Sequence, residues 1–295
     1  MPELPEVEGL CRDLSRALPG RSIAEFDLRL PKVFHPSPGL GPVDLVGATF
    51  ETVRRRAKML VFRLSKDLSV VTHLRLSGQL VLVKGGEVLV AGGHPVPGFG
   101  APLPHKSTHA IFTLDDDSRL YYTDIRQFGF LALMPSGDVS AFLAGQDLGL
   151  EPLQPEFTQD ALAALLTARR RARLKPLLLD QAGVAGLGNI YADESLWWAR
   201  LHPLRLAGSL SAEEVARLHA AILAVLDYAL THGVARVIGT RADPSRDFPH
   251  AHGREGKACP RCGTTVERFR LGGRSTYYCP NCQPDPSTRE GSEQG

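Results

Sequence analysis

Four of the five cysteines in the chain are spaced as metal ligands. Cys259 and Cys262 form one Cys-x2-Cys pair, and Cys279 and Cys282 form a second pair after sixteen intervening residues. Two such pairs let four thiolates meet tetrahedrally around Zn²⁺ on β-hairpins. Because all four positions are filled by protein ligands, the spacing predicts one structural zinc ion rather than a catalytic one. A finger of about thirty residues has too little core to fold without that metal.

The N-terminus carries a candidate nucleophile. Pro2 is small enough to permit removal of the initiator Met1, which exposes a secondary amine. An amine of this class keeps a neutral, nucleophilic fraction at about pH 7 to 8. Its attack on a sugar C1′ carbon gives an iminium that is cationic without protonation and can draw electrons in an elimination. Glu3 lies beside it as a proton donor and acceptor. Read alone, proline at this position is more commonly a tolerated start.

A glycine-rich segment, GLGN at 186–189, precedes a helix predicted from Ile190 to about Arg200. Glycines let backbone N–H groups approach a phosphate, and a helix N-terminus adds a favourable partial charge. A dinucleotide site is excluded because the third glycine of GxGxxG and the preceding strand of a βαβ unit are both missing. Two interpretations stay open, a phosphate-binding turn and a simple turn between helices with Asn189 as the N-cap.

The sequence predicts a β-rich region followed by a helical region, and the candidate residues are distributed over both. Residues 5–18 place apolar side chains at helical spacing, which predicts an amphipathic helix. Short strand-like runs then predict a β-sandwich or barrel, at 58–64, 69–76, 79–84, 87–91, 109–114 and 119–123. From Thr158 onward the periodicity becomes helical, with helices predicted at 158–168, from Pro176, at 190–200 and after the capping-box pattern of Ser211 and Glu214.

Charge and hydropathy narrow the class of protein. The 295 residues carry 34 Lys+Arg against 32 Asp+Glu, a balance too mild to indicate nucleic-acid binding. Residues 253–283, however, hold six cations against two acidic residues, which is either a solvated face or a phosphate-facing surface. The longest apolar run, 220–226, is far shorter than the roughly 18 to 20 residues that cross a bilayer, so no membrane span is expected. Four acidic residues among the first twenty argue against a secretory signal and predict a cytoplasmic protein.

In series, the motifs resemble the formamidopyrimidine-DNA glycosylase family, which also contains endonuclease VIII. The matching segments cover residues 1 to about 283 in the right order: MPELPEVE at 1–8, the Lys58 segment, HLRLSG at 73–78, TDIRQFG at 123–129, GLGNIY at 186–191 and the zinc hairpin. The resemblance implies an α+β fold of two domains, an N-terminal β-sandwich with an N-terminal helix and a C-terminal helix-two-turn-helix bundle with a β-hairpin zinc finger.

Domain limits follow from the resemblance and from the change of composition after residue 137. We expect a catalytic β-sandwich domain at 1–134, a linker at 135–156 and a helix-two-turn-helix DNA-binding domain with a lesion loop at 157–252. A zinc finger at 253–283 and a disordered tail at 284–295 complete the chain.

The resemblance also assigns roles to individual residues. Pro2 matches the Schiff-base nucleophile, Glu3 the catalytic acid/base, Lys58 the β-hairpin proton donor and Arg274 the zinc-finger arginine that grips a phosphate. The positions matching DNA contacts are His73 and Asn189 at phosphates, Lys175 near the lesion, Leu76, Arg126 and Phe128 in a wedge that fills the gap left by a flipped nucleotide, and His252 in place of a phosphate-contacting tyrosine. If Lys58, His73, Asn189 and Arg274 each neutralise a phosphate, the log–log salt slope is about −3 to −4.

The activity implied is that of a bifunctional DNA glycosylase and abasic-site lyase in base excision repair. Such an enzyme excises oxidised bases of the 8-oxoguanine or formamidopyrimidine type and nicks the strand by β,δ-elimination. It acts as a monomer on double-stranded DNA that contains a damaged base or an abasic site, with one structural Zn²⁺ and no organic cofactor.

Two alternatives stay open. The loop at 234–251 is shorter than in typical 8-oxoguanine enzymes and lacks their Gly-Tyr-Phe segment, which favours a preference for oxidised pyrimidines in the manner of endonuclease VIII. The other alternative is a non-catalytic zinc-ribbon protein that binds damaged DNA. The intact set of Pro2, Glu3, Lys58 and Arg274 argues against it.

Overall fold

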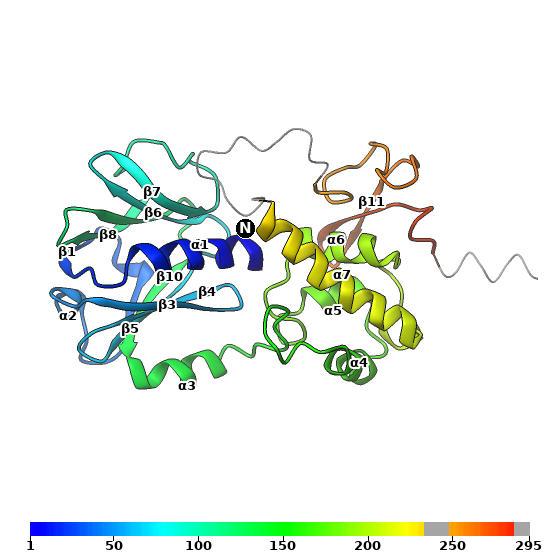
Figure 1. Cartoon of the computed structure of the whole chain (residues 1–295), viewed down its shortest axis with the longest axis horizontal. Coiled ribbons are helices and arrows are strands. Elements are labelled where there is room, and N and C mark those ends of the chain that lie inside the picture. Colours follow the sequence, from blue (N-terminus) through cyan, green and yellow to red (C-terminus); the bar gives the residue numbers. More distant parts are fainter. Residues whose placement is uncertain (233–247, 286–295) are drawn as a thin grey trace, which may run out of the picture. The chain divides into compact units, whose positions relative to one another are not determined.

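The computed structural model describes residues 1–232 and 248–285 (Figure 1). Two predicted segments lie largely outside that range, the loop at 234–251 and the tail at 284–295. The described helices are α1 (Leu4–Ala17), α2 (Pro42–Leu45), α3 (Val139–Ala144), α4 (Gln159–Ala168), α5 (Leu174–Leu179), α6 (Asn189–Ala199) and α7 (Ala212–Thr231). The described strands are β1 (Ile23–Leu28), β2 (Phe34–Pro36), β3 (Phe50–Arg56), β4 (Met59–Leu64), β5 (Leu68–His73), β6 (Gly78–Lys84), β7 (Glu87–Gly93), β8 (Thr108–Leu114), β9 (Arg119–Asp124), β10 (Phe130–Pro135), β11 (Glu267–Leu271) and β12 (Arg274–Tyr278).

The chain forms two compact units. The first contains Met1–Gln146, and the second contains Asp147–Thr231 together with the described residues 248–285. Strands β1 to β10 belong to the first unit, whereas helices α4 to α7 and the hairpin β11–β12 belong to the second. The segment expected to be a linker, 135–156, contains α3 and spans the boundary between the units.

The first unit is the β-sandwich that the sequence predicts. One sheet has the strand order β1-β8-β9-β6-β7 and the other has the order β2-β10-β5-β4-β3. Neighbouring strands are antiparallel except for β10 and β2, which are parallel. Inward-facing side chains of both sheets form one core, with Phe62 and Leu133 from one sheet and Leu80 and Phe112 from the other. Alternation of inward and outward side chains along each strand makes such a core possible.

Helix α1 packs on the sandwich along β7, β3 and β4. Its buried stripe includes Val7, Leu10 and Leu14, and Cys11 is only 8 % exposed within the same core. Gly92 of β7 permits the close approach, because a Cβ atom there would lie 3.0 Å from the Cβ atom of Leu10. The helix predicted at 5–18 is confirmed within one residue, and it packs against three strands of the sandwich.

Turns in the first unit decide where strands end. Gly85 and Gly86 both have positive φ, 58° and 85°, as a two-residue hairpin turn between β6 and β7 requires. The run predicted at 69–76 ends instead at His73, because Arg75 adopts a φ of 51° that no strand contains. Residues 74–77 form a turn at that point, and β6 begins immediately after it.

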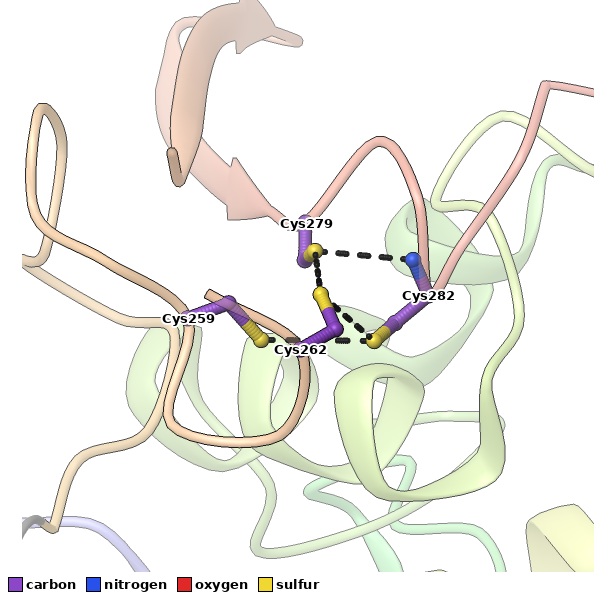
Figure 2. Close-up of side chains that lie close together, drawn as sticks. All are labelled: Cys259, Cys262, Cys279 and Cys282. Carbon is purple, nitrogen blue, oxygen red and sulfur yellow. Dashed lines mark hydrogen bonds between the residues drawn. The ribbon is translucent and has the colours of Figure 1, made fainter. Parts of the chain in front are cut away.

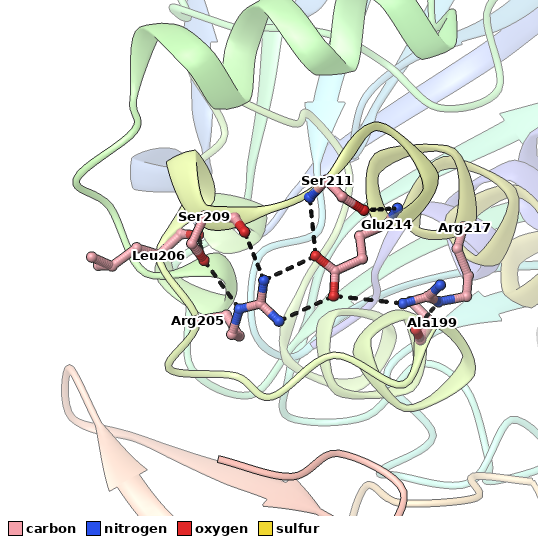
Figure 3. A network of polar contacts seen from close by, with 7 residues as sticks. All are labelled: Ala199, Arg205, Leu206, Ser209, Ser211, Glu214 and Arg217. Carbon is pink, nitrogen blue, oxygen red and sulfur yellow. Dashed lines mark hydrogen bonds and ion pairs between the residues drawn. The ribbon is translucent and has the colours of Figure 1, made fainter. Parts of the chain in front are cut away.

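The second unit is helical, and its predicted helices at 158–168 and 190–200 are confirmed within one residue as α4 and α6. Helix α7 begins at the predicted capping box (Figure 3). The Ser211 hydroxyl accepts a hydrogen bond of 3.2 Å from the Glu214 N–H, and the Glu214 carboxylate accepts one of 3.0 Å from the Ser211 N–H. Arg205 donates two further bonds to that carboxylate, at 2.9 and 3.1 Å. Across the described residues, no helix is both long and apolar enough to cross a membrane.

Candidate functional site

The N-terminal end of α1 presents the candidate nucleophile and acid/base. Glu3 is the N-cap residue in an extended conformation, and Pro5 enters the first helical turn. The Glu6 carboxylate accepts a hydrogen bond of 2.8 Å from the Glu3 N–H, so the first turn holds the backbone that carries Glu3. The Glu3 side chain is only 3 % exposed, and Pro2 is also buried. A carboxylate at a helix N-terminus is stabilised by the helix dipole.

Lys58 lies in the two-residue turn between β3 and β4, directly after Ala57, whose φ is 49°. The Arg55 guanidinium holds this turn in place, since it donates bonds of 2.7 Å both to the Ala57 carbonyl oxygen and to the Glu8 carboxylate. The Arg55 side chain is 3 % exposed. Glu8 belongs to α1, so this ion pair ties the lysine-bearing turn to the helix whose first turn carries Pro2 and Glu3.

The same ion pair controls the charge of Glu8. Burial opposes ionisation of this carboxyl, but hydrogen bonds and positive charges from Arg55 and Arg12 outweigh burial and hold its pKa below the usual value. Glu8 is therefore an anion at neutral pH. Neither Glu8 nor Arg55 is a candidate from the sequence, although both position residues that are.

His73 ends β5 beside the Lys58 turn, because it pairs with Met59 on one side and with Phe130 on the other. Burial, with further contributions from the charges of Arg75 and Lys58, lowers the pKa of His73 to about 3. The neutral ring accepts a hydrogen bond of 2.9 Å at Nδ1 from the Arg75 N–H, which places the ring proton on Nε2. His73 is thus an uncharged hydrogen-bond donor in this structure, and its expected contact with a phosphate stays a prediction.

The three wedge candidates come from two adjacent turns of the first unit. Phe128 is 55 % exposed and Arg126 is exposed, whereas Leu76 is half-buried. The Arg126 guanidinium lies 5.1 Å from the centre of the Phe128 ring. The Arg126 N–H donates a bond of 2.9 Å to the hydroxyl of Ser77, the residue after Leu76, so the two turns are joined directly. The two turns thus hold the three wedge candidates next to one another, with Arg126 and Phe128 facing solvent.

In the second unit, two candidates converge on the strand that carries Arg274. Lys175 Nζ donates a bond of 2.7 Å to the carbonyl oxygen of Ser275, and the Asn189 amide donates one of 3.0 Å to the same oxygen. Arg274 itself is exposed at the start of β12. Asn189 has two amide N–H donors, and this contact uses one of them.

Lys175 and His252 meet at Asp193, which the sequence does not single out. The Lys175 side chain is 1 % exposed and pairs with Asp193 at 2.7 Å, while His252 Nδ1 lies 2.8 Å from the other carboxylate oxygen. The neighbouring Glu194 accepts bonds from the backbone N–H groups of His250, Ala251 and His252 at 2.8 to 2.9 Å. Two buried carboxylates of α6 thus hold both the lysine and the segment that enters the finger.

The four predicted ligand cysteines lie together below the hairpin β11–β12 (Figure 2). Their sulfur atoms are all within 4.8 Å of one another, and no other such group of ligand side chains occurs among the described residues. Four sulfurs at the zinc–thiolate bond length of about 2.3 Å from a tetrahedral ion would be about 3.8 Å apart, so the cluster fits zinc. The Trp197 indole donates a bond of 3.4 Å to Cys259 Sγ, the kind of outer contact that orients a metal thiolate.

Family models match three parts of the chain. The formamidopyrimidine-DNA glycosylase N-terminal domain matches residues 1–131, and the H2TH domain of the same enzyme matches residues 148–239. The zinc finger found in FPG and IleRS matches residues 256–284, which include all four cysteines.

Relatives match the chain over nearly its full length. A formamidopyrimidine-DNA glycosylase from Pelotomaculum thermopropionicum is 41 % identical over 290 residues, which cover 96 % of this chain and 99 % of the relative. The enzyme of the same name from Symbiobacterium thermophilum is 42 % identical over 292 residues, covering 97 % and 90 %.

Solved structures agree with these matches. Lactococcus lactis Fpg bound to DNA that contains an abasic site is 29 % identical, with a TM-score of 0.82 and coverage of 96 % of this chain and all of that one. The complex of the same protein with DNA that contains Fapy-dG gives the same identity, TM-score and coverage.

Proposed function

The chain belongs to the formamidopyrimidine-DNA glycosylase family, and we propose that it excises oxidised bases from duplex DNA through Pro2 and Glu3. It is a DNA glycosylase with abasic-site lyase activity, and its partner is DNA that contains a damaged base or an abasic site. One observation carries the assignment of residues. Pro2 and Glu3 stand at the fixed N-terminus of α1, and the Arg55–Glu8 ion pair ties that helix to the turn of Lys58.

The proposed reaction begins after removal of Met1. The Pro2 nitrogen attacks C1′ of the flipped nucleotide, and the bond from C1′ to the base breaks while Glu3 and Lys58 supply protons. The sugar opens to an iminium, which accepts electrons as the 3′ phosphate and then the 5′ phosphate leave by β,δ-elimination. Leu76, Arg126 and Phe128 fill the gap in the stack, with Arg126 facing the orphaned base, because an inserted side chain offsets the cost of unstacking.

The C-terminal unit supplies phosphate contacts. We propose that Arg274 grips the phosphate beside the lesion and that Asn189 and the Lys175–Asp193–His252 group support this contact through Ser275 and the segment entering the finger. Cys259, Cys262, Cys279 and Cys282 would hold one Zn²⁺, whose contribution is to fix the hairpin. No organic cofactor is required by this scheme. We also propose that the enzyme works as a monomer in the cytoplasm, where it meets the cell's DNA.

The lesion preference is proposed to be the oxidised purine. The Lactococcus lactis protein, which covers 96 % of this chain, is seen with Fapy-dG in its DNA. The resemblance of Arg126 and Phe128 to the wedge residues of the formamidopyrimidine-DNA glycosylase branch favours the same preference. The short segment 234–251, which lies mostly outside the described residues, favours the pyrimidine alternative. A substrate comparison decides between them.

Borohydride trapping tests the proposed chemistry. The protein with Met1 removed, verified by intact mass, is incubated with duplexes that contain 8-oxoguanine, an oxidised pyrimidine or a plain abasic site. We expect a covalent adduct with all substrates that reach the iminium, formed faster with 8-oxoguanine than with the pyrimidine. The opposite ranking supports the endonuclease VIII-like alternative. Absence of every adduct, together with salt-sensitive DNA binding, supports a non-catalytic damage binder.

Salt dependence separates the charged phosphate contacts from the neutral ones. Arg274→Gln is expected to reduce the magnitude of the log–log salt slope by about 0.9, because one phosphate loses its cation. His73→Gln is expected to lower duplex affinity at neutral pH without changing the slope, because the pKa of His73 is about 3. Fluorescence anisotropy at several salt concentrations measures both. An equal loss of slope in the two variants would mean that His73 binds DNA as a cation.

A further inference from the structure

The loop that carries Arg126 and Phe128, residues 125–129, needs an external restraint. It joins β9 to β10 and leaves Ile125 45 % exposed and Phe128 55 % exposed. Gln127 has a φ of 57°, in the left-handed region that a residue with a Cβ atom rarely adopts. Neither apolar burial nor intrinsic backbone preference therefore explains why this wedge loop holds one conformation.

The restraint comes from Asp124, which is fully buried directly before the wedge loop. Its Oδ1 atom accepts bonds from the Ser77 hydroxyl and, at 3.1 Å, from the Arg126 N–H. Its Oδ2 atom accepts a bond of 2.8 Å from the Gly129 N–H. One carboxylate thus binds Arg126 near the start of the loop, Gly129 at its end, and Ser77 in the neighbouring turn that contains Leu76.

The far end of the wedge loop also has no room to move inward. A Cβ atom on Gly129 would lie 2.7 Å from the carbonyl oxygen of His73 and would overlap the hydroxyl of Tyr122. The main chain of Asp124 adds a second tie, because its carbonyl oxygen accepts a bond of 3.3 Å from the Gln127 N–H and one of 2.7 Å from His109 Nε2. The loop is pinned along its length while its side chains face solvent.

These bonds require a carboxylate. All three partners of the Asp124 side chain are donors, and an ionised carboxylate is a pure acceptor that forms stronger bonds than a neutral group. An amide of the same shape would turn an NH₂ group toward one of these donors. Substitution by asparagine therefore disrupts one side of the clamp without changing the volume of the site.

We propose that Asp124 is a positioning residue that pre-organises the wedge loop for extrusion of the damaged nucleotide. This inference rests on the proposed function and deepens it. With the clamp intact, Arg126 and Phe128 enter the stack without first being ordered, so the ordering cost is absent from the flipping step. Asp124 matters when a base must leave a duplex stack, and it does not matter for cleavage at an abasic site in a single strand, where no stack has to be filled.

The test compares these two substrates in the full-length, zinc-containing protein. Asp124→Asn is expected to slow single-turnover excision of 8-oxoguanine from duplex DNA by about tenfold or more, since small misplacements cost up to about 100-fold. Its cleavage of a single-stranded oligonucleotide with one abasic site should stay close to the wild-type rate. It should also discriminate less between bases opposite the lesion, because Arg126 no longer has a fixed position toward the orphaned base.

Two further variants keep the comparison interpretable. Asp117→Asn makes the same chemical change on the exposed turn at the other end of β9 and should behave as wild type on both substrates. Ser77→Ala removes one donor of the clamp and should give a smaller loss, again confined to duplex excision, and it serves if Asp124→Asn unfolds. Equal losses on both substrates, or unchanged duplex excision in a folded Asp124→Asn protein, would overturn the inference. Failure of the wild-type protein on both substrates would instead count against the proposed function.

Discussion

Pro2→Gly is expected to reduce base excision by about 1000-fold or more, because changing a catalytic nucleophile commonly costs at least that much. The variant still loses Met1 and still presents an N-terminal amine, but that amine is primary. Glycine lacks the pyrrolidine ring that fixes the nitrogen toward C1′, and misplacing a reacting group slows the attack that releases the base. In the later elimination, a primary amine gives an imine that must be protonated before it can accept electrons, whereas the proline nitrogen gives a permanent cation. Single-turnover excision of 8-oxoguanine from duplex DNA measures the loss.

Duplex affinity separates this chemical role from a structural one. Pro2 precedes α1 and is not among the proposed phosphate contacts, so Pro2→Gly should bind damaged duplex about as tightly as wild type. Pro38→Gly, in an exposed turn of the same unit, provides the matched control and should retain full activity. Glu3→Gln should also lose excision, by about 100- to 10,000-fold, because general acid–base catalysis is worth that much. Excision at the wild-type rate in Pro2→Gly would show that the secondary amine is not required, and the trapped peptide would show whether the N-terminal amine or a lysine attacks C1′.

The residues that the sequence predicts best are those whose chemistry is local. The four cysteines are recognisable from two short spacings, and the structure brings their sulfur atoms together. The capping box of Ser211 and Glu214 spans three residues and is confirmed by both of its hydrogen bonds. Pro2 and Glu3, whose roles stay a prediction, are adjacent and lie at the start of the confirmed helix α1. In each case the pattern lies within a short stretch of the chain, so no knowledge of the tertiary fold is needed.

The residues that position the site cannot be recognised from short sequence patterns. Glu8 and Arg55 are 47 positions apart, as are Ser77 and Asp124, and each pair meets only because the sandwich brings different elements together. Asp193 and Lys175 meet inside the helical unit, where burial of both charges is tolerable because they are paired. A signal does exist in the sequence, since a charged residue inside an otherwise apolar pattern needs a partner. The pattern alone does not name that partner.

Some strands can be recognised from the sequence and others cannot. The runs at 79–84 and 87–91 are recognised because a Gly-Gly turn separates them. The sequence of β3, FETVRRR, ends in three arginines, so the alternation of buried and exposed residues that is typical of a strand is not recognisable. One of these arginines, Arg55, binds Glu8. β10 lies between β5 and β2, and its continuous apolar run FLALMP has no period that separates a strand from a buried helix. β3 and β10 can therefore be assigned as strands only from their positions in the tertiary structure.

Removal of the metal is the second change with a large expected effect. Cys279→Ser, or treatment with a strong zinc chelator, should lower affinity for damaged duplex by at least about 100-fold, since charge-assisted contacts of the hairpin are worth about 1.5 to 3 kcal/mol each. The binding free energy of a structural zinc, roughly 10 to 16 kcal/mol in small fingers, is also folding free energy, so the hairpin β11–β12 should unfold without it. Arg274 then loses its fixed position, as does Ser275, to which Lys175 and Asn189 donate.

The fifth cysteine supplies the control for this prediction. Cys11 is buried in the first unit, where its thiol contacts the Val53 carbonyl oxygen and burial raises its pKa to about 11. Cys11→Ala should keep one zinc per chain by metal analysis and wild-type duplex affinity by anisotropy, whereas Cys279→Ser should lose both. Cleavage of a single-stranded abasic oligonucleotide should fall less than duplex binding in Cys279→Ser, because Pro2 and Glu3 belong to the first unit. A zinc-free protein that binds damaged duplex as tightly as wild type would show that the finger is not a DNA contact.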